Sequence, residues 1–331
     1  MDLLTQGLIG ASLATTAAGE TETRRAALIG FASGLLADAD ALFFSPADPL
    51  LVIENHRHFT HSLFFVPVGA LIAAALLWPF FRRKTAFKKL YLFSFLGYSL
   101  SGFIDACTSY GTHWLWPVWP ERISFHIISI VDPVFSLALL AGLLAAIIKK
   151  RPRYVAPALL FCAFYLGLGL LQNARAQEQA RNLAQVREQE IRRLVVKPTI
   201  GNIFLWRSTY MTGDEIYVDA IHVGPFKTRA YPGARVRIFR PEKDLARIEK
   251  NTRLYRDVLR FRKFSDGFIG IDKSLPKVLG DMRFSMTPNG TRPLWGITLD
   301  PSRPEKPPPY RFYRDFTKED RRRFTDMLLG R

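Results

Sequence analysis

Long apolar stretches occupy most of the first half of the chain. His61–Phe81 continues for 21 residues without Asp, Glu, Lys or Arg. Shorter stretches of similar character are Ala26–Leu36, Leu90–Ile104, Val134–Ile148 and Val155–Leu171. A hydrocarbon core of about 30 Å needs roughly 20 helical residues, and these stretches are apolar all round, whereas a helix in a soluble bundle keeps a polar face. The pattern therefore favours membrane-spanning helices over the buried helices of a soluble protein.

The N-terminal segment Met1–Glu20 is also mostly apolar. Asp2 stands where a secretory signal would carry basic residues, so the segment is not typical of a signal peptide. It predicts either a weak first membrane helix or a helix lying in the interface, and its Gly7 and Gly10 would allow close packing against other helices. We therefore expect residues 1–171 to form an α-helical integral membrane domain with five or six helices.

Basic residues on short loops predict the orientation of these helices. The basic clusters lie at residues 24–25, 82–89 and 149–153. Because short loops rich in Lys and Arg stay in the cytoplasm, the opposite ends of the helices are expected outside. Those ends lie near residues 38–60, 105–132 and from 172 onward. The sequence therefore predicts a multi-pass membrane protein whose C-terminal part lies outside. In a bacterium this would be the inner (cell) membrane, with the C-terminal part in the periplasm.

The second half of the chain has a different pattern. Residues 172–197 are rich in Ala, Gln, Glu and Arg, and predict a connecting helix that stops at Pro198. Residues 198–331 predict a small soluble β-rich (α+β) domain, because short segments there alternate between apolar and polar residues. The predicted strands of an antiparallel sheet are Phe204–Tyr210, Glu215–Val223, Arg235–Phe239, Phe268–Asp272, Met282–Met286 and Leu294–Leu299. A short helix is expected over Glu242–Asn251, and a basic helix at the end of the chain.

Charge separates the two halves further. The chain has a formal net charge of +17, and residues 172–331 carry 33 of its 46 Lys and Arg residues. The basic residues are scattered and form no recognised nucleic-acid motif, so no nucleic acid is expected as a partner. Apposition to an anionic lipid bilayer explains the charge better. Only two cysteines are present, which excludes a disulfide framework.

Acidic and histidine side chains collect at the predicted outer ends of the apolar stretches. The candidate metal ligands are Asp38, Asp40, His56, His61, Asp105 and Asp132, with His58 and His113 as further candidates. Ionisable groups at a membrane boundary are costly and are usually paired, metal-bound or functional. Mixed imidazole and carboxylate ligands suit Zn²⁺, with Mn²⁺ or Fe²⁺ as alternatives, better than Ca²⁺ or Mg²⁺. The pattern predicts a divalent-metal site at the outer surface.

The motifs that carry these residues resemble those of a known family. They are Met1–Gly10 (MDLLTQGLIG), Gly34–Asp40 (GLLADAD), His56–Ser62 (HRHFTHS), Asp105–Gly111 (DACTSYG) and Ile130–Pro133 (IVDP). In this combination and order they resemble the membrane-bound metal-dependent hydrolases of the LexA-regulated inner-membrane type. The chain departs from the family pattern in three places. Ala37 replaces a proline, His58 replaces a small residue, and Gln6 stands where some members have histidine.

The resemblance implies a chemistry as well as a location. The His/Asp pattern of the family is distantly similar to zinc-dependent phospholipase C and single-strand nucleases, which use several metal ions. By that likeness we expect hydrolysis of a phosphoester by a metal-activated water. A site at the bilayer surface favours a lipid or lipid-linked phosphate as substrate. Arg57 and Arg122 are the candidates for contact with an anionic substrate group.

Two other functions are compatible with the same residues. The cluster could hold a structural metal in a non-enzymatic membrane protein whose basic domain docks a partner. A metal transporter is a weaker alternative, because its ligands should lie near the bilayer midplane rather than at one boundary. The sequence does not indicate an oligomeric state.

Overall fold

The computed structural model of the protein describes residues 1–42 and 45–331. The chain divides into two units. The first comprises residues 1–42, 55–171 and 200–203, and the second comprises residues 45–54, 172–199 and 204–331. A short piece of the first half of the sequence, residues 45–54, thus belongs to the second unit.

The first unit is built from helices, as the apolar stretches predict. They are α1 (Leu3–Thr16), α2 (Thr23–Leu36), α4 (Val66–Phe81), α5 (Phe87–Ser99), α6 (Ser101–Ala106), α7 (Pro133–Lys149) and the first part of α8 (Val155–Val186). Short 3₁₀ segments join them: η1 (Glu20–Glu22), η2 (Ala37–Leu42), η3 (Phe59–His61), η4 (Leu63–Phe65) and η5 (Pro152–Tyr154). Helix starts follow capping rules, since the side chains of Asp2 and Asp132 accept hydrogen bonds from the first turns of α1 and α7.

Glycines bring α1, α2 and α5 into backbone contact. A Cβ atom added at Gly30 would lie 2.3 Å from the carbonyl oxygen of Gly10, and one added at Gly97 would lie 2.6 Å from the carbonyl oxygen of Gly30. Gly7 faces the ring of Phe31 in the same way. The close helix packing expected from Gly7 and Gly10 is therefore present, and small residues make such an approach possible.

The number of membrane-length helices is smaller than expected. Among the described residues, two helical segments are long and apolar enough to cross a bilayer, Leu63–Phe81 with 19 residues and Pro152–Val186 with 35. Pro133–Lys149 is a shorter apolar helix. The prediction of five or six membrane helices is thus not supported by helix length. The physical reason is that α2 gives way to a 3₁₀ segment at Ala37 and that the helical stretch around residue 100 is divided between α5 and α6.

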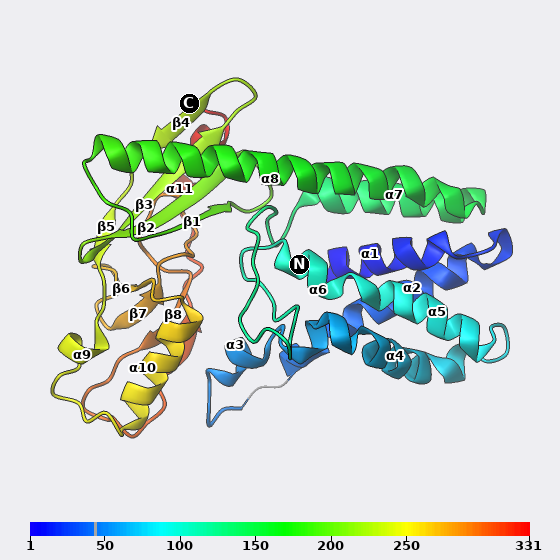
Figure 1. Ribbon diagram of the computed structural model, residues 1–331, viewed down its shortest axis with the longest axis horizontal. Helices are drawn as coiled ribbons and strands as arrows, with labels where there is room; N and C mark the ends of the chain where they lie inside the picture. The colour runs from blue at the N-terminus through cyan, green and yellow to red at the C-terminus, as the bar shows by residue number, and fades with distance from the viewer. Residues whose placement is uncertain (43–44) are drawn as a thin grey trace. The chain divides into compact units, whose positions relative to one another are not determined.

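The three basic turns of the helical unit lie at one of its ends. The turns join α1 to α2, α4 to α5 and α7 to α8, and Figure 1 shows them together at the end of the unit farthest from α6. These are the positions of the basic clusters at residues 24–25, 82–89 and 149–153. Helix α6, which carries Asp105, lies at the other end, and Asp38 and His61 lie close to Asp105. The helical unit therefore has a basic end and an acidic end.

The second unit contains two antiparallel sheets rather than one. The first has the order β1 (Arg193–Pro198), β2 (Leu205–Thr212), β3 (Glu215–Val223), β4 (Thr228–Tyr231), with β5 (Arg235–Arg237) also paired to β3. The second has the order β6 (Ile269–Ile271), β7 (Val278–Asp281), β8 (Trp295–Thr298), β9 (Tyr310–Phe312). The remaining helices are α3 (Leu51–Asn55), α9 (Pro241–Asp244), α10 (Arg253–Phe264) and α11 (Lys318–Leu328). The β-rich character of this part of the chain is thus confirmed.

Several predicted boundaries in the second half are wrong. The connecting helix is the end of α8 and stops at Val186, because residues 193–198 pair with β2 as a strand. The strand expected at Met282–Met286 lies earlier, at β7. The helix expected at Glu242–Asn251 shrinks to the four residues of α9, and α10 follows it instead. Pairing partners distant in the sequence decide these boundaries, and local pattern does not reveal them.

Arg207 ties the two sheets of the second unit together. Its guanidinium is fully buried and donates hydrogen bonds to the carbonyl oxygens of Thr287, Pro288, Gly290 and Met282, at 2.7–3.1 Å. Burial lowers the pKa of Arg207 to about 9. The carbonyls compensate the cost of burying the charge and hold the loop after β7 against β2.

The packing of the helical unit yields a test. Gly30→Ala should lower the free energy of unfolding by about 1–3 kcal/mol, because the new methyl group forces α1 and α2 apart. Gly167→Ala is the matched control, since a Cβ atom at Gly167 meets nothing within 4 Å. Denaturant titration of the protein in detergent would measure both variants. Equal stability of the two would contradict the described backbone contact.

Candidate metal centre

Five side chains from three segments converge at the acidic end of the helical unit. Asp38 and Asp40 lie on η2, His56 and His61 lie in the segment that contains η3, and Asp105 lies on α6. Ligand atoms of Asp38, His61 and Asp105 lie within 4.8 Å of one another, as do those of Asp38, Asp40 and His56. Residues up to 67 positions apart in the sequence thus form two overlapping groups, with Asp38 in both.

Asp40 organises the segment that carries the histidines. One carboxylate oxygen lies 2.9 Å from Nδ1 of His56, and the other accepts hydrogen bonds from the backbone N–H of Arg57 at 2.8 Å and from Oγ1 of Thr60 at 2.6 Å. Arg57 has a φ of +60°, a value uncommon outside glycine, and its N–H points at Asp40 in that conformation. The backbone between His56 and His61 is therefore shaped around one carboxylate.

Gly102 lets α6 approach the same segment. A Cβ atom at this position would lie 1.9 Å from the carbonyl oxygen of His61, so no other residue fits there without a shift of the backbone. Tyr98, at the end of α5, donates a hydrogen bond of 2.6 Å to the carbonyl oxygen of Thr60. These two contacts hold the segment with His61 against α6, which carries Asp105.

Some side-chain nitrogen and oxygen atoms of Asp38, His61 and Asp105 lie close together but lack hydrogen-bond partners among the described residues. Nε2 of His61 lies 3.3 Å from Oδ1 of Asp38 and 3.0 Å from Oδ2 of Asp105. In the described part of the chain, these three atoms and Oδ2 of Asp38 have no hydrogen-bond partner, and all are buried. Buried polar atoms in proteins nearly always have partners. Converging, unsatisfied imidazole and carboxylate atoms fit a divalent cation of the Zn²⁺ type.

The surroundings keep the carboxylates ionised and His56 neutral. Burial alone would raise the pKa of Asp40, but the hydrogen bonds from His56, His61 and Thr60 outweigh it and lower that pKa. For Asp38, burial is likewise outweighed by the neighbouring His61 and Arg57, and the pKa falls. Burial lowers the pKa of His56, against the opposing effect of Asp40. Ionised carboxylates and neutral imidazoles are the forms that bind metals.

Arg57 supplies a counter-charge inside the site. Its side chain is almost fully buried, with Nε 3.1 Å from Oδ2 of Asp105 and Nη1 donating to Thr108. Asp105 also contacts the main-chain amine of Met1, whose carbonyl oxygen accepts a hydrogen bond from Nη2 of Arg57. A guanidinium engaged in this way positions Asp105. The structure therefore favours a positioning role for Arg57 over the expected contact with a substrate.

One side of the site is less enclosed. The side chain of His56 is 25% exposed. Arg122 is partly exposed there, donates a hydrogen bond of 2.7 Å to the carbonyl oxygen of His56, and stacks its guanidinium over the ring of Tyr110. The guanidinium of Arg57 lies against the same ring. Arg122 is thus the arginine whose position suits contact with an incoming anion.

Three predicted ligands lie outside the two groups. Asp132 caps α7 through the N–H of Phe135 and accepts a hydrogen bond from the hydroxyl of Tyr165. The rings of His58 and His113 lie 4.4 Å apart, and Nδ1 of His113 lies 2.6 Å from the carbonyl oxygen of Pro120. Helix capping and loop packing thus account for these side chains.

Some residues of the site could not be recognised from the pattern. Thr60 was not among the candidates, but its hydroxyl donates a hydrogen bond to Asp40. Nothing in the sequence around Gly102 and Tyr98 indicates that they support the site. Gln6, in the position where some family members have histidine, donates a hydrogen bond to the carbonyl oxygen of Ser101. Only the spacing of Thr60 within the HRHFTHS motif could have pointed to the site.

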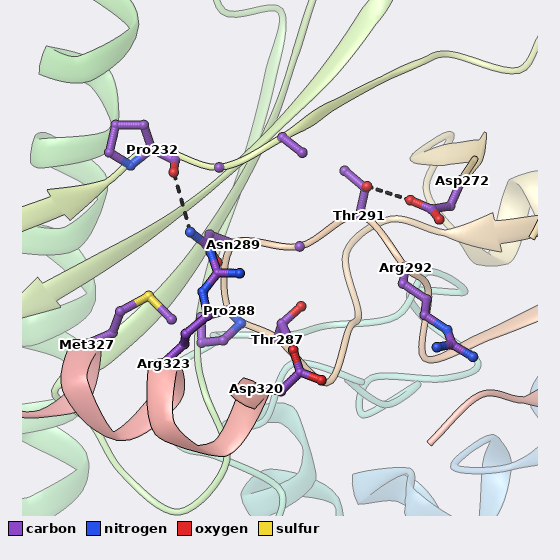
Figure 2. A pocket seen from close by; sticks show the side chains of 13 residues that line it. Pro232, Asp272, Thr287, Pro288, Asn289, Thr291, Arg292, Asp320, Arg323 and Met327 are labelled. Atoms are coloured by element: carbon purple, nitrogen blue, oxygen red, sulfur yellow. Dashed lines mark hydrogen bonds between the residues drawn. The ribbon is translucent and has the colours of Figure 1, made fainter. Parts of the chain in front are cut away.

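A pocket in the second unit has a different character (Figure 2). It has a volume of about 470 Å³ and lies between the loop Thr287–Thr291 and α11. Asp272 accepts a hydrogen bond from Thr291, and Asp320 accepts one from Thr317 in the capping box of α11. Both carboxylates therefore serve the local structure, in contrast to Asp38 in the helical unit.

The fold and the site define a helical membrane protein with a buried cluster of aspartate and histidine at one end of its helices. Residues 1–176 match the YdjM inner membrane protein family, and the chain belongs to this family. This finding confirms the resemblance noted above as far as an inner-membrane family. Metal dependence and hydrolysis stay predictions.

A curated relative matches half of the chain. The chain is 27% identical over 168 residues to the uncharacterized protein YfhP of Bacillus subtilis (strain 168). The match covers 50% of this chain and 50% of the relative, so the chain spans about half the length of the curated protein that it matches. No solved structure matches the chain.

The burial of Arg57 generates a prediction about stability. Arg57→Met should lower the free energy of unfolding of the chelator-treated protein by about 3–5 kcal/mol, because it leaves buried carboxylates without their counter-charge. Arg83→Met, an exposed site in the same unit, should change it by no more than about 0.5 kcal/mol. Denaturant titration in detergent measures both. Similar values for the two variants would show that the guanidinium does not compensate Asp105.

Proposed function

We propose that the cluster at the acidic end of the helical unit binds divalent cations and that the protein is a membrane-bound, metal-dependent hydrolase of a phosphoester. The observation that carries the proposal is the set of buried, unsatisfied donor atoms on Asp38, His61 and Asp105. Zn²⁺ suits these donors best, and Mn²⁺ or Fe²⁺ would also be accepted.

The ligand groups assign a role to each residue. Asp38, His61 and Asp105 would hold one cation, and Asp38, Asp40 and His56 would hold a second, with Asp38 shared. A bound cation of this kind supplies a water of lowered pKa and positive charge for a phosphoryl oxygen. Asp40 and Thr60 orient the imidazoles by hydrogen bonds, a function that ligand-supporting groups often have.

The two arginines divide the remaining tasks. Arg57 stays within the protein, where it positions Asp105 through the 3.1 Å contact and holds the backbone beside Asp40. Arg122, on the open side, would bind the non-reacting oxygens of an anionic substrate. The partial exposure of His56 supports a site with an open coordination position, in contrast to a closed structural metal site, in which protein takes all positions.

The position of the site indicates the class of substrate. It lies at the end of the helical unit opposite the basic turns, among residues that close or open apolar helices. A phosphoester presented at the membrane surface, on a lipid or a lipid-linked carrier, would reach it directly. We further propose that α1, α2, α5 and α7 lie in the membrane beside the two longer segments, because Leu4, Leu28 and Leu137 are among their exposed apolar side chains.

The charges of the turns and the contacts of residues 45–54 support a proposal about which side of the membrane each part lies on. The basic turns are expected in the cytoplasm, which would place the acidic end at the periplasmic surface. Arg260 of α10 binds both carboxylate oxygens of Glu54, at 2.6 and 2.9 Å, and Asp48 at 2.9 Å. Since these residues share a unit with the C-terminal sheets, both would lie on the periplasmic side.

The metal proposal predicts a paired loss. Asp38→Asn and His61→Gln should each reduce bound zinc in the purified protein, and hydrolysis of a chromogenic phosphodiester, by at least about 100-fold, because each removes a direct ligand. Elemental analysis and a plate assay measure the two quantities. Asp132→Asn is the control that should keep both, since asparagine still caps α7.

The outcomes separate the candidate functions. Zinc retained in Asp38→Asn and His61→Gln would contradict the site. Both variants could lose zinc while the unaltered protein hydrolyses no phosphodiester, phosphomonoester or lipid phosphate. That result would support a structural metal site and contradict the proposed hydrolase activity.

The proposed sidedness is tested by cysteine labelling. Asp214→Cys, in the β2–β3 turn, should react with a membrane-impermeant maleimide in cells whose outer membrane alone is permeable, whereas Arg83→Cys should react only after lysis. The native Cys107 and Cys162 are buried and give little background. Labelling of Arg83→Cys alone in unlysed cells would reverse the orientation.

A further inference from the structure

The hairpin between β3 and β4 ends in an exposed aromatic side chain. Phe226 is 96% exposed, more than any other large apolar residue in the described part of the chain. It follows Gly224 and Pro225 in a tight loop, closed by the hydrogen bond of 2.9 Å from the N–H of Gly224 to the carbonyl oxygen of Lys227. Exposure of a large aromatic ring on a closed loop calls for an apolar partner.

Other exposed apolar residues surround the hairpin. Phe204, 42% exposed, is joined to the end of β3 by a backbone hydrogen bond of 2.7 Å from Val223. Leu329, 57% exposed, lines the same shallow depression as Phe226. Phe204, Phe226 and Leu329, which we call the hairpin patch, therefore lie at one end of the first sheet.

The hairpin patch lies at a defined level along α8. Arg187, just after α8, binds Asp219 in the middle of β3, and Gln172 binds the carbonyl oxygen of Val223 at 2.9 Å. Going from Asp219 to Val223, β3 therefore runs back along α8, as Figure 1 allows the reader to follow. Gln172 is the first polar residue after the apolar stretch that ends at Leu171. Gln172, the residue that directly follows the apolar stretch of α8, is therefore bonded to the end of the strand that leads into the hairpin patch.

The charges near the patch are positive. Lys227 and Arg229 line the same depression as Phe226, and the lining residues in the described chain include neither Asp nor Glu. The guanidinium of Arg229 donates a hydrogen bond of 3.0 Å to the carbonyl oxygen of Gly330 and stacks over Tyr231. Aromatic side chains flanked by lysine and arginine are typical of protein surfaces that enter an anionic lipid interface.

We propose that the hairpin patch inserts into the headgroup region of an anionic bilayer, with Phe226 in the acyl boundary and Lys227 and Arg229 at the phosphates. We propose the membrane as the partner because the strand that leads into the patch is bonded to Gln172, and Gln172 directly follows the apolar stretch of α8. This role concerns the second unit alone and does not depend on the metal site or on hydrolysis.

The test uses the full-length protein in vesicles with and without anionic lipid. Phe226→Cys is labelled with an environment-sensitive fluorophore, and quenching by spin-labelled lipid is measured. Asp214→Cys is the matched control: it lies in the turn at the other end of β3, whose nine residues span about 30 Å. We expect the label at 226 to be blue-shifted and strongly quenched by lipid, and the label at 214 to be quenched only by aqueous iodide.

A second measurement addresses the charges. Lys227→Gln and Arg229→Gln, introduced together into Phe226→Cys, should remove most of the preference for anionic vesicles, which amounts to about fivefold per basic residue at low ionic strength. Equal lipid quenching at positions 226 and 214 would overturn the proposal. A blue shift at 226 that depends on protein concentration but not on quencher lipid would assign the patch to a second copy of the chain, and would overturn it as well.

Discussion

A carboxylate removed from water needs compensation close by, and the acidic end of the helical unit is arranged around that requirement. Asp38, Asp40 and Asp105 are all buried. Asp40 accepts hydrogen bonds from the segment that carries the histidines, whereas Asp105 lies against the guanidinium of Arg57 and the amine of Met1 while its Oδ2 has no hydrogen-bond partner among the described residues. Both carboxylate oxygens of Asp38 lack a hydrogen-bond partner in the described part of the chain, although His61 and Arg57 lie close enough to lower its pKa. That combination is what a metal centre requires before metal is bound.

The scaffold depends on close approach of backbones. The glycine contacts of α1, α2 and α5 bring the end of α2, and with it η2, near the start of α6. Gly102 then allows the carbonyl of His61 to rest on α6. A protein interior transmits small displacements because it is tightly packed. The positions of the candidate ligands therefore depend on glycines, which have no functional side chain.

The sequence pointed to most of the residues that the structure brings together, because these candidate ligands are of residue types that stand out in apolar surroundings. Asp38, His61 and Asp105 are ionisable residues at the ends of apolar stretches. Burying such a residue there is costly, so a role in pairing, metal binding or function is expected. Asp132 has the same position and residue type, yet it caps a helix, because a carboxylate before a helix is equally suited to that task. The burial of Arg57 could not be predicted from the sequence either, because it results from contacts with residues far away along the chain.

The fold was predictable where it depends on local pattern and not where it depends on distant partners. The helices and the β-rich second half follow from apolar runs and alternation. The division into two sheets, the early end of α8 and the strand β1 follow from pairing that only the folded chain reveals. The number of helices of full membrane length was overestimated, because an apolar run such as Leu90–Ile104 does not show that its helix breaks near residue 100.

The contacts of Arg260 with Glu54 and Asp48 have a consequence for the order in which the protein matures. Residues 45–54 lie between two pairs of candidate ligands, but their partners are made some two hundred positions later in synthesis. A nascent chain that has released both ligand pairs from the ribosome still lacks the arginine that anchors the loop between them. Residues 45–54 can therefore adopt their final position only when α10 has emerged and folded.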